Sequence, residues 1–146
     1  MPEKDLSASL EDYLEAIYHF TQEKSFAQAN QVAQALGVGK SSVTWALNQL
    51  QQKGLINHAP YEAITLTDTG RLLAQKVVRS HEGIKRFLMQ VLAVPEDMAQ
   101  ENACRMEHVI EREIMERMGR FTEIILACPR TECVEKLKAC TRPERD

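Results

Sequence analysis

With 146 residues, 44% of them hydrophobic, the chain can bury a core as one domain or as two small ones. No apolar run reaches the roughly 18 residues of a membrane span, and the first residues, MPEKDLSASLEDY, lack the features of a secretion signal. We therefore expect a cytoplasmic protein with no membrane partner. Residues 1–70 hold four Lys or Arg against eight Asp or Glu, which argues against strong unspecific binding of phosphates.

Residues 9–24 predict an amphipathic helix with Ser9 as its N-cap. Its apolar stripe consists of Leu10, Tyr13, Leu14 and Ile17. Asp12 and Glu15 lie three residues apart on the opposite face. Such a pair is most often solvated, but it could also supply two oxygen ligands to a metal whose other ligands come from elsewhere.

Residues 26–53 predict two short helices joined by a tight turn. The first helix spans about residues 30–36 and ends at Gly37, and the second begins at Ser41 or its neighbour. Two helices joined by a short turn that contains glycine form a helix-turn-helix, although an ordinary helical hairpin is the alternative. The second helix begins with groups suited to phosphates and base edges. The candidate DNA-binding residues are Lys40, Ser41, Ser42, Thr44 and the exposed Trp45.

Residues 55–66 predict a two-stranded hairpin. The strands cover about residues 55–58 and 63–66, with a turn through Pro60. A helix-turn-helix followed by such a hairpin is a winged helix. This wing contains no Lys or Arg, only His58, which is a weak composition for gripping phosphates.

The remaining sequence predicts helices over residues 68–93, 96–111, 112–127 and 131–139. The first of these carries His81 near its middle, and a lone histidine is more often a surface or core residue than a ligand. The apolar stripes in this half suit a dimer interface, as expected for a protein that reads paired half-sites on DNA.

The segment ENACRMEHVIE, residues 101–111, holds the strongest chemical pattern in the chain. On a helix, Cys104, Glu107, His108 and Glu111 share one face. The apolar Ala99, Ala103, Met106 and Ile110 fall on another. Thiolate, carboxylate and imidazole all bind divalent transition metals. Three ligands do not complete a coordination sphere, so a solvated polar face with a chance cysteine remains the alternative.

Three further cysteines, Cys128, Cys133 and Cys140, follow a C-x4-C-x6-C pattern that is not a standard zinc spacing. We expect Cys133 and Cys140 to share a helix face and to pack against the body of the protein. The alternative is a second thiolate site or a redox pair.

The order of EDYLEAIY, SSVTWALNQL, LTDTGRLLA, VVRSHEGIKRFL and ENACRMEHVIE resembles the diphtheria-toxin-repressor and manganese-transport-regulator family over about residues 9–126. The resemblance implies a dimeric winged-helix transcription factor that binds double-stranded operator DNA when it is loaded with Fe²⁺ or Mn²⁺. The metal ligands that it implies are Asp12, Glu15, His81, Cys104, Glu107 and His108.

The chain also departs from both branches of that family. Iron-type members have an ancillary metal site with a glutamate and a second histidine where this chain has Lys85 and Gln100. They have methionine at the position of Asp12 and a base-contacting glutamine at that of Trp45, whereas manganese-type members have a carboxylate at that of Cys104. The thiolate leads us to expect Fe²⁺ ahead of Mn²⁺, with Co²⁺, Ni²⁺ or Zn²⁺ able to substitute.

Together these patterns predict a mainly α protein with two domains. Residues 1–70 form a winged helix-turn-helix DNA-binding domain with a small two-stranded wing, and residues 71–146 form an all-helical metal-binding and dimerisation domain. We expect a homodimeric repressor of metal-homeostasis genes rather than an enzyme. The alternatives are a winged-helix regulator that senses a small molecule or an oxidant through its cysteines, and a metalloenzyme, for which the chain offers no further catalytic residues.

Overall fold

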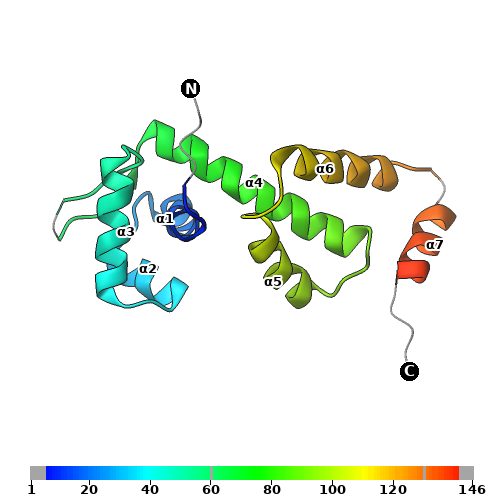
Figure 1. Cartoon of the computed structure of the whole chain (residues 1–146), viewed down its shortest axis with the longest axis horizontal. Helices are drawn as coiled ribbons and strands as arrows, with labels where there is room; N and C mark the ends of the chain where they lie inside the picture. Colours follow the sequence, from blue (N-terminus) through cyan, green and yellow to red (C-terminus); the bar gives the residue numbers. More distant parts are fainter. Residues whose placement is uncertain (1–5, 60, 130, 142–146) are drawn as a thin grey trace. The chain divides into compact units, whose positions relative to one another are not determined.

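The computed structural model describes residues 6–59, 61–129 and 131–141. Its helices and strands, in chain order, are α1 (Ala8–Lys24), α2 (Ala29–Leu36), α3 (Lys40–Gln52), β1 (Ile56–Asn57), β2 (Thr65–Leu66), α4 (Asp68–Gln90), α5 (Glu96–Met106), α6 (Arg112–Leu126) and α7 (Thr131–Thr141) (Figure 1). The predicted fold class, mainly α with a helix-turn-helix and a two-stranded wing, is therefore confirmed. Within the described residues, no helix combines the length and apolar character needed to span a membrane.

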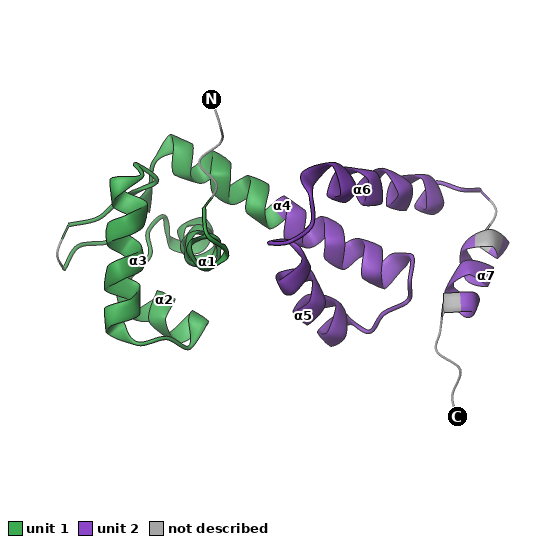
Figure 2. Cartoon of the chain, in the orientation of Figure 1, with its two compact units in different colours: residues 1–78 green, residues 79–146 purple. Residues whose placement is uncertain are grey.

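Two compact units, residues 1–78 and 79–146, divide the chain within α4 (Figure 2). Helix α4 is continuous and contributes residues to both units. The assignment of separate roles to residues 1–70 and 71–146 stays a prediction.

The N-cap of helix α1 lies two residues earlier than predicted. Ser7, not Ser9, is the N-cap, and its Oγ accepts a hydrogen bond from the backbone N–H of Leu10. Leu6, directly before this cap, is also buried in the core of the first unit, so the packed segment begins earlier than the predicted helix. Its predicted stripe, Leu10, Tyr13, Leu14 and Ile17, is buried in the core of the first unit.

The helix-turn-helix is confirmed in its details. Gly37 ends α2 in the left-handed region with φ 63°, and its N–H donates to the carbonyl oxygens of Ala33 and Gln34. A side chain at that φ would be strained, so glycine suits the turn. Helix α3 then buries Val43, Ala46, Leu47 and Leu50, as predicted.

The wing is shorter than its sequence pattern predicts. Strands β1 and β2 pair antiparallel over two residues each, with Ile56 opposite Leu66. Ile64 leaves the hairpin ladder and pairs with Ala27 instead, with N···O distances of 2.8 and 2.9 Å. A third segment of the chain thus takes over the backbone groups that a longer strand would have used. The predicted turn residue Pro60 lies outside the described residues.

The second unit has its own apolar core. The C-terminal half of α4 contributes Ile84 and Leu88, and α5 contributes Ala99 and Ala103. Phe87 lies 6.5 Å from Phe121, centroid to centroid, which brings α6 against α4. These contacts fix the helices that carry the chemical groups of this unit.

Helix α5 ends at Met106, five residues before its predicted end. The backbone N–H groups of Val109 and Ile110 both donate to the carbonyl oxygen of Met106, so the chain turns there before α6 begins. Met106 and Ile110 both pack against the core of the second unit, which explains the turn. Glu107 and His108 therefore lie in the turn after α5.

The tail prediction is wrong for Cys140, which is exposed on α7 rather than packed against the body of the protein. Cys128 is half-buried and reduced. The side chain of Cys133 lies outside the described residues.

The start of α4 packs tightly against the residues before the wing. Thr67 Oγ1 donates to the carbonyl oxygen of Gly54 at 2.7 Å and accepts from the N–H of Gly70 at 3.0 Å. A Cβ on Gly70 would stand 1.8 Å from the carbonyl oxygen of Leu55, a backbone atom. Only glycine permits this approach.

We predict that Gly70→Ala lowers the free energy of unfolding by about 1–3 kcal/mol, because the new methyl group forces backbone to move. The matched control is Gly83→Ala on the same helix, where a Cβ meets nothing within 4 Å. That change should raise stability by up to about 1 kcal/mol, as expected for alanine in a helix interior. Urea denaturation of both variants tests this, and equal stabilities would contradict it.

Candidate metal centre and DNA-binding face

A buried carboxylate lies beside two histidines in the second unit. His81 comes from α4, while Glu107 and His108 come from the turn after α5. The His81 and Glu107 side chains are 5% and 1% exposed, and His81 Nδ1 lies 3.0 Å from Glu107 Oε2. The second oxygen, Glu107 Oε1, lies 3.5 Å from His108 Nε2.

Glu107 Oε1 makes no hydrogen bond to any of the residues that the structure describes. A buried carboxylate oxygen without a hydrogen bond costs free energy unless a positive charge is near. The cluster of Glu107, His81 and His108 could therefore bind a cation through this oxygen and through imidazole nitrogens. This arrangement supports a metal centre on grounds independent of sequence spacing.

The other five predicted ligands are placed as follows. His81 and His108 are described above as neighbours of Glu107, and Cys104 is exposed on α5 one turn earlier. Asp12 and Glu15 are half-buried on α1, in the first unit. Glu15 Oε1 lies 3.5 Å from His19 Nε2, one turn along the helix. The second unit by itself thus gathers a histidine, a glutamate and a second histidine.

The sequence analysis did not predict the contacts of two polar residues in the second unit, Gln100 and Lys85. Gln100 on α5 donates from its amide to His81 Nε2 at 2.9 Å. Lys85, one turn after His81 on α4, forms an ion pair with Glu96 at 3.1 Å. A glutamine and a lysine carry no metal-ligand pattern, so only the resemblance drew attention to these positions.

The predicted DNA-binding residues lie on the first two turns of α3. All five are exposed: Lys40, Ser41, Ser42, Thr44 and Trp45. Trp45 is 52% exposed, which is high for a tryptophan. Thr44 Oγ1 donates to the backbone carbonyl of Lys40, so this hydroxyl has an intrahelical partner.

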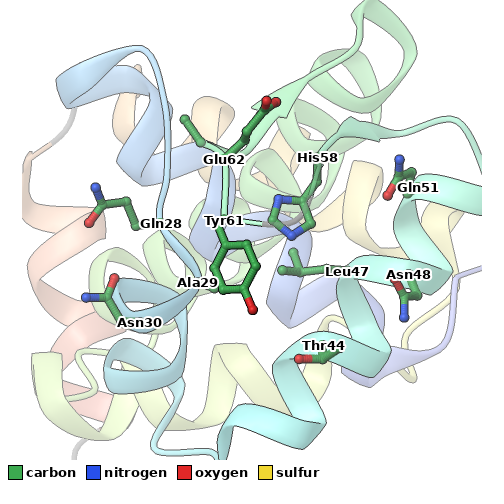
Figure 3. Close-up of a pocket in the computed structure, with 11 residues that line it drawn as sticks. Gln28, Ala29, Asn30, Thr44, Leu47, Asn48, Gln51, His58, Tyr61 and Glu62 are labelled. Atoms are coloured by element: carbon green, nitrogen blue, oxygen red, sulfur yellow. The ribbon is translucent and has the colours of Figure 1, made fainter.

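Thr44 also borders a cavity of about 600 Å³ in the first unit. Figure 3 shows this cavity between the beginning of α2, the exposed side of α3 and the wing. Its polar lining residues are Gln28, Asn30, Thr44, Asn48, Gln51, His58, Tyr61 and Glu62. Apart from Thr44, the sequence analysis did not propose these residues for DNA binding, although Thr44, Asn48 and Gln51 recur at helical spacing.

The wing contributes His58, Tyr61 and Glu62 to this cavity. His58 Nδ1 is buried and makes no hydrogen bond among the described residues, and Tyr61 is fully exposed with φ 64°. No Lys or Arg lines the cavity. Its surface can donate and accept hydrogen bonds but carries little positive charge.

Two family models match successive parts of the chain. Residues 5–64 match the model of the iron-dependent repressor N-terminal DNA-binding domain. Residues 67–134 match that of the iron-dependent repressor metal-binding and dimerisation domain.

Individual relatives cover most of this chain. A helix-turn-helix-type transcriptional regulator of Methanocaldococcus jannaschii is 40% identical, over 81% of this chain and 95% of the relative. The helix-turn-helix-type transcriptional regulator MntR of Geobacillus kaustophilus is 32% identical, over 79% of this chain and 81% of the relative.

A solved structure is similar over one part of its length. The manganese regulator SloR has a TM-score of 0.70 and 28% identity, over 82% of this chain. This chain covers 56% of that protein, which is thus considerably longer. From the two matching domain models and the curated relatives together, we conclude that the chain belongs to the iron-dependent repressor family of metal-dependent transcriptional regulators.

Proposed function

We propose that this protein is a homodimeric repressor that binds double-stranded operator DNA when it holds Fe²⁺, and that it controls metal-homeostasis genes. The observation that carries the proposal is the buried Glu107 carboxylate, which has one oxygen without a hydrogen bond among the described residues and a histidine on each side. It lies in the part of the chain that matches a metal-binding and dimerisation domain. A regulator that binds operator DNA must reach the chromosome, so we also propose that the protein is cytoplasmic.

The proposed ligand set joins the two units. Asp12, Glu15, His81, Cys104, Glu107 and His108 would hold the metal. A bound divalent cation would supply positive charge that offsets the carboxylates contributed by α1 and by the turn after α5. Because Asp12 and Glu15 belong to the DNA-binding unit, metal affinity and DNA affinity should be coupled, and each should strengthen the other by the same factor.

Charge explains why this coupling matters for DNA binding. Residues 1–70 contain four Lys or Arg against eight Asp or Glu, so this part of the chain has a net charge of −4. The carboxylates of Asp12 and Glu15 repel the phosphate backbone. Neutralising them favours the DNA-bound state, which makes the metal a switch between two populations.

The homodimer is supported by apolar side chains that the second unit leaves exposed. Those on α6 and the preceding turn are Val109, Ile114, Phe121, Ile124 and Leu126. The sequence analysis expected the apolar stripes of this half to suit a dimer interface. Large apolar side chains that stay exposed on one helix are typical of an interface, and the proposed partner is a second copy of the chain.

The preference for Fe²⁺ rests on the mixture of donors. The thiolate of Cys104 is soft and favours Fe²⁺, Co²⁺ or Zn²⁺, whereas Asp12, Glu15 and Glu107 are hard and favour Mn²⁺. Mn²⁺ is the second candidate, and Co²⁺, Ni²⁺ or Zn²⁺ could substitute in vitro. The alternative of a regulator that senses a small molecule or an oxidant through its cysteines receives no support from the family comparison.

The central experiment combines metal binding with DNA binding. An operator is first selected from random duplex DNA by the Fe²⁺-loaded protein under anaerobic conditions, and its binding is then measured by electrophoretic shift. We predict that Glu107→Gln, which removes the charge but keeps the size, weakens metal affinity at least about tenfold and abolishes the metal-dependent shift.

The matched control for that experiment is Glu111→Gln, an exposed glutamate one turn further along the chain. It should bind metal and operator like the wild type. Circular dichroism checks that both variants fold. An unchanged metal affinity in Glu107→Gln would refute the site.

A second prediction concerns Cys104. Cys104→Glu replaces a soft ligand by a hard one, so Mn²⁺ should gain relative to Fe²⁺ in activating operator binding. Competitive titration with both ions measures the ranking, and Cys128→Glu, changed outside the proposed site, is the control. If the ranking of the two ions does not move, Cys104 is not a ligand.

A third prediction concerns the dimer. Ile124→Glu places a charge on a side chain that is 68% exposed on α6, and each dimer would bury it twice. We expect the dissociation constant of the dimer to rise about tenfold or more in analytical ultracentrifugation. Leu72→Glu, which alters a side chain 63% exposed in the first unit, should leave the dimer unchanged. Equal dissociation of both variants would contradict an interface on α6.

A further inference from the structure

Both ring nitrogens of His81 have partners on different sides. Nδ1 lies 3.0 Å from Glu107 Oε2, and Nε2 lies 2.9 Å from the amide nitrogen of Gln100. An amide nitrogen can only donate, so His81 Nε2 accepts and the ring proton is on Nδ1, which donates to the carboxylate. His81 is 4% exposed, and these two contacts help to fix the orientation of its ring.

A second contact between the same helices lies one turn later on α4 and one turn earlier on α5. Lys85 follows His81 by four residues on α4, and Glu96 precedes Gln100 by four on α5. Lys85 Nζ lies 3.1 Å from Glu96 Oε1, and the Lys85 side chain is only 18% exposed. The Lys85 ammonium group is therefore held by α5 one helical turn from His81 along α4. A second divalent cation at Nε2 would have to displace Gln100 and approach this ammonium group.

We infer that Gln100 is a positioning residue, which presents Nδ1 of His81 to the metal and, with Lys85, keeps the Nε2 side closed to a second ion. The inference rests on the proposed function and extends it to residues that are not ligands. A nitrogen that binds a metal carries no proton, so a metal held by Nδ1 would leave the ring proton of His81 on Nε2. By rotating its amide half a turn, Gln100 then offers its oxygen as acceptor for Nε2–H.

Gln100 could thus form a hydrogen bond with His81 both without and with a bound metal. Metal-binding histidines usually donate their second N–H to a fixed acceptor, which sets the orientation of the ring and strengthens the ligand. A glutamine can first donate and later accept, because its amide carries both groups. A glutamate or histidine at position 100 would be able to bind metal itself, whereas an amide oxygen paired with Nε2–H is not available for it.

The first test follows the two nitrogens directly. In protein labelled with ¹⁵N-histidine, we expect Zn²⁺ to shift the Nδ1 resonance of His81 as a metal-bound nitrogen, while Nε2 becomes a protonated nitrogen. A metal-bound signal from Nε2 would overturn the inference while leaving the proposed function intact. If neither nitrogen responds to Zn²⁺ and calorimetry shows no binding, the proposed metal site itself fails.

The second test separates support from packing. Gln100→Ala should weaken Zn²⁺ binding by about tenfold, as expected when a supporting partner is lost. Gln100→Met, which keeps the length of the side chain but removes the amide, should weaken Zn²⁺ binding to the same extent. The control is Asn102→Ala, which removes an exposed amide that donates within α5 to the carbonyl oxygen of Met98. Equal Zn²⁺ affinities for Gln100→Ala and the wild type would contradict the positioning role.

The third test makes the Nε2 side of His81 able to bind a second metal ion. Lys85→Glu combined with Gln100→His removes the ammonium group and adds two ligands next to Nε2. We expect this double variant to bind one more equivalent of Zn²⁺ per chain than the wild type in calorimetry and in metal analysis. An unchanged metal content would show that these two side chains do not keep a second ion out.

Discussion

The burial of the Glu107 carboxylate is the constraint on which the second unit depends. A carboxylate that is 1% exposed loses its hydration and needs hydrogen bonds or positive charge in return. His81 supplies one hydrogen bond, and His108 lies 3.5 Å from the other oxygen. The turn after α5 places this group, and the apolar contacts between α4, α5 and α6 hold the turn in position. A bound cation, as in the proposed metal site, would compensate for the missing hydrogen bond of Glu107 Oε1.

Much of the fold could be predicted because its helices bury regular apolar stripes. The helix-turn-helix was found from the stripe of α3 and from Gly37, whose φ of 63° requires a residue tolerant of that conformation. The points that were missed depend on tertiary contacts. Ser7 is the cap directly after the buried Leu6, and α5 ends at Met106, after which Ile110 packs against the core of the second unit. Local sequence carries little information on either.

The candidate site was predictable in its donors but not in its supports. Cysteine, glutamate and histidine at positions 104, 107 and 108 reveal a metal pattern because few other roles bring these types together. His81 was implied only by the resemblance, since one histidine within a helix has no diagnostic spacing. Gln100 is 19 residues from His81 in the sequence. An amide can pair with many kinds of group, so its contact with His81 could not be predicted from the residue type. Such contacts exist only once α4 and α5 have packed.

The charge of the DNA-binding unit explains why a bound metal would have a large effect in the proposed mechanism. Lys24, Lys40 and Lys53 are the only cationic Lys or Arg side chains in the described part of residues 1–70, and the cavity beside α3 is lined by neutral and acidic groups. Binding to DNA through many cations gains most of its free energy from counterion release, and it is then strong whatever the state of the regulator. With few cations, this unit gains little from that source. In the proposed mechanism, neutralising Asp12 and Glu15 would remove a large fraction of the net charge of this unit, so a single bound metal would decide whether the protein occupies its operator.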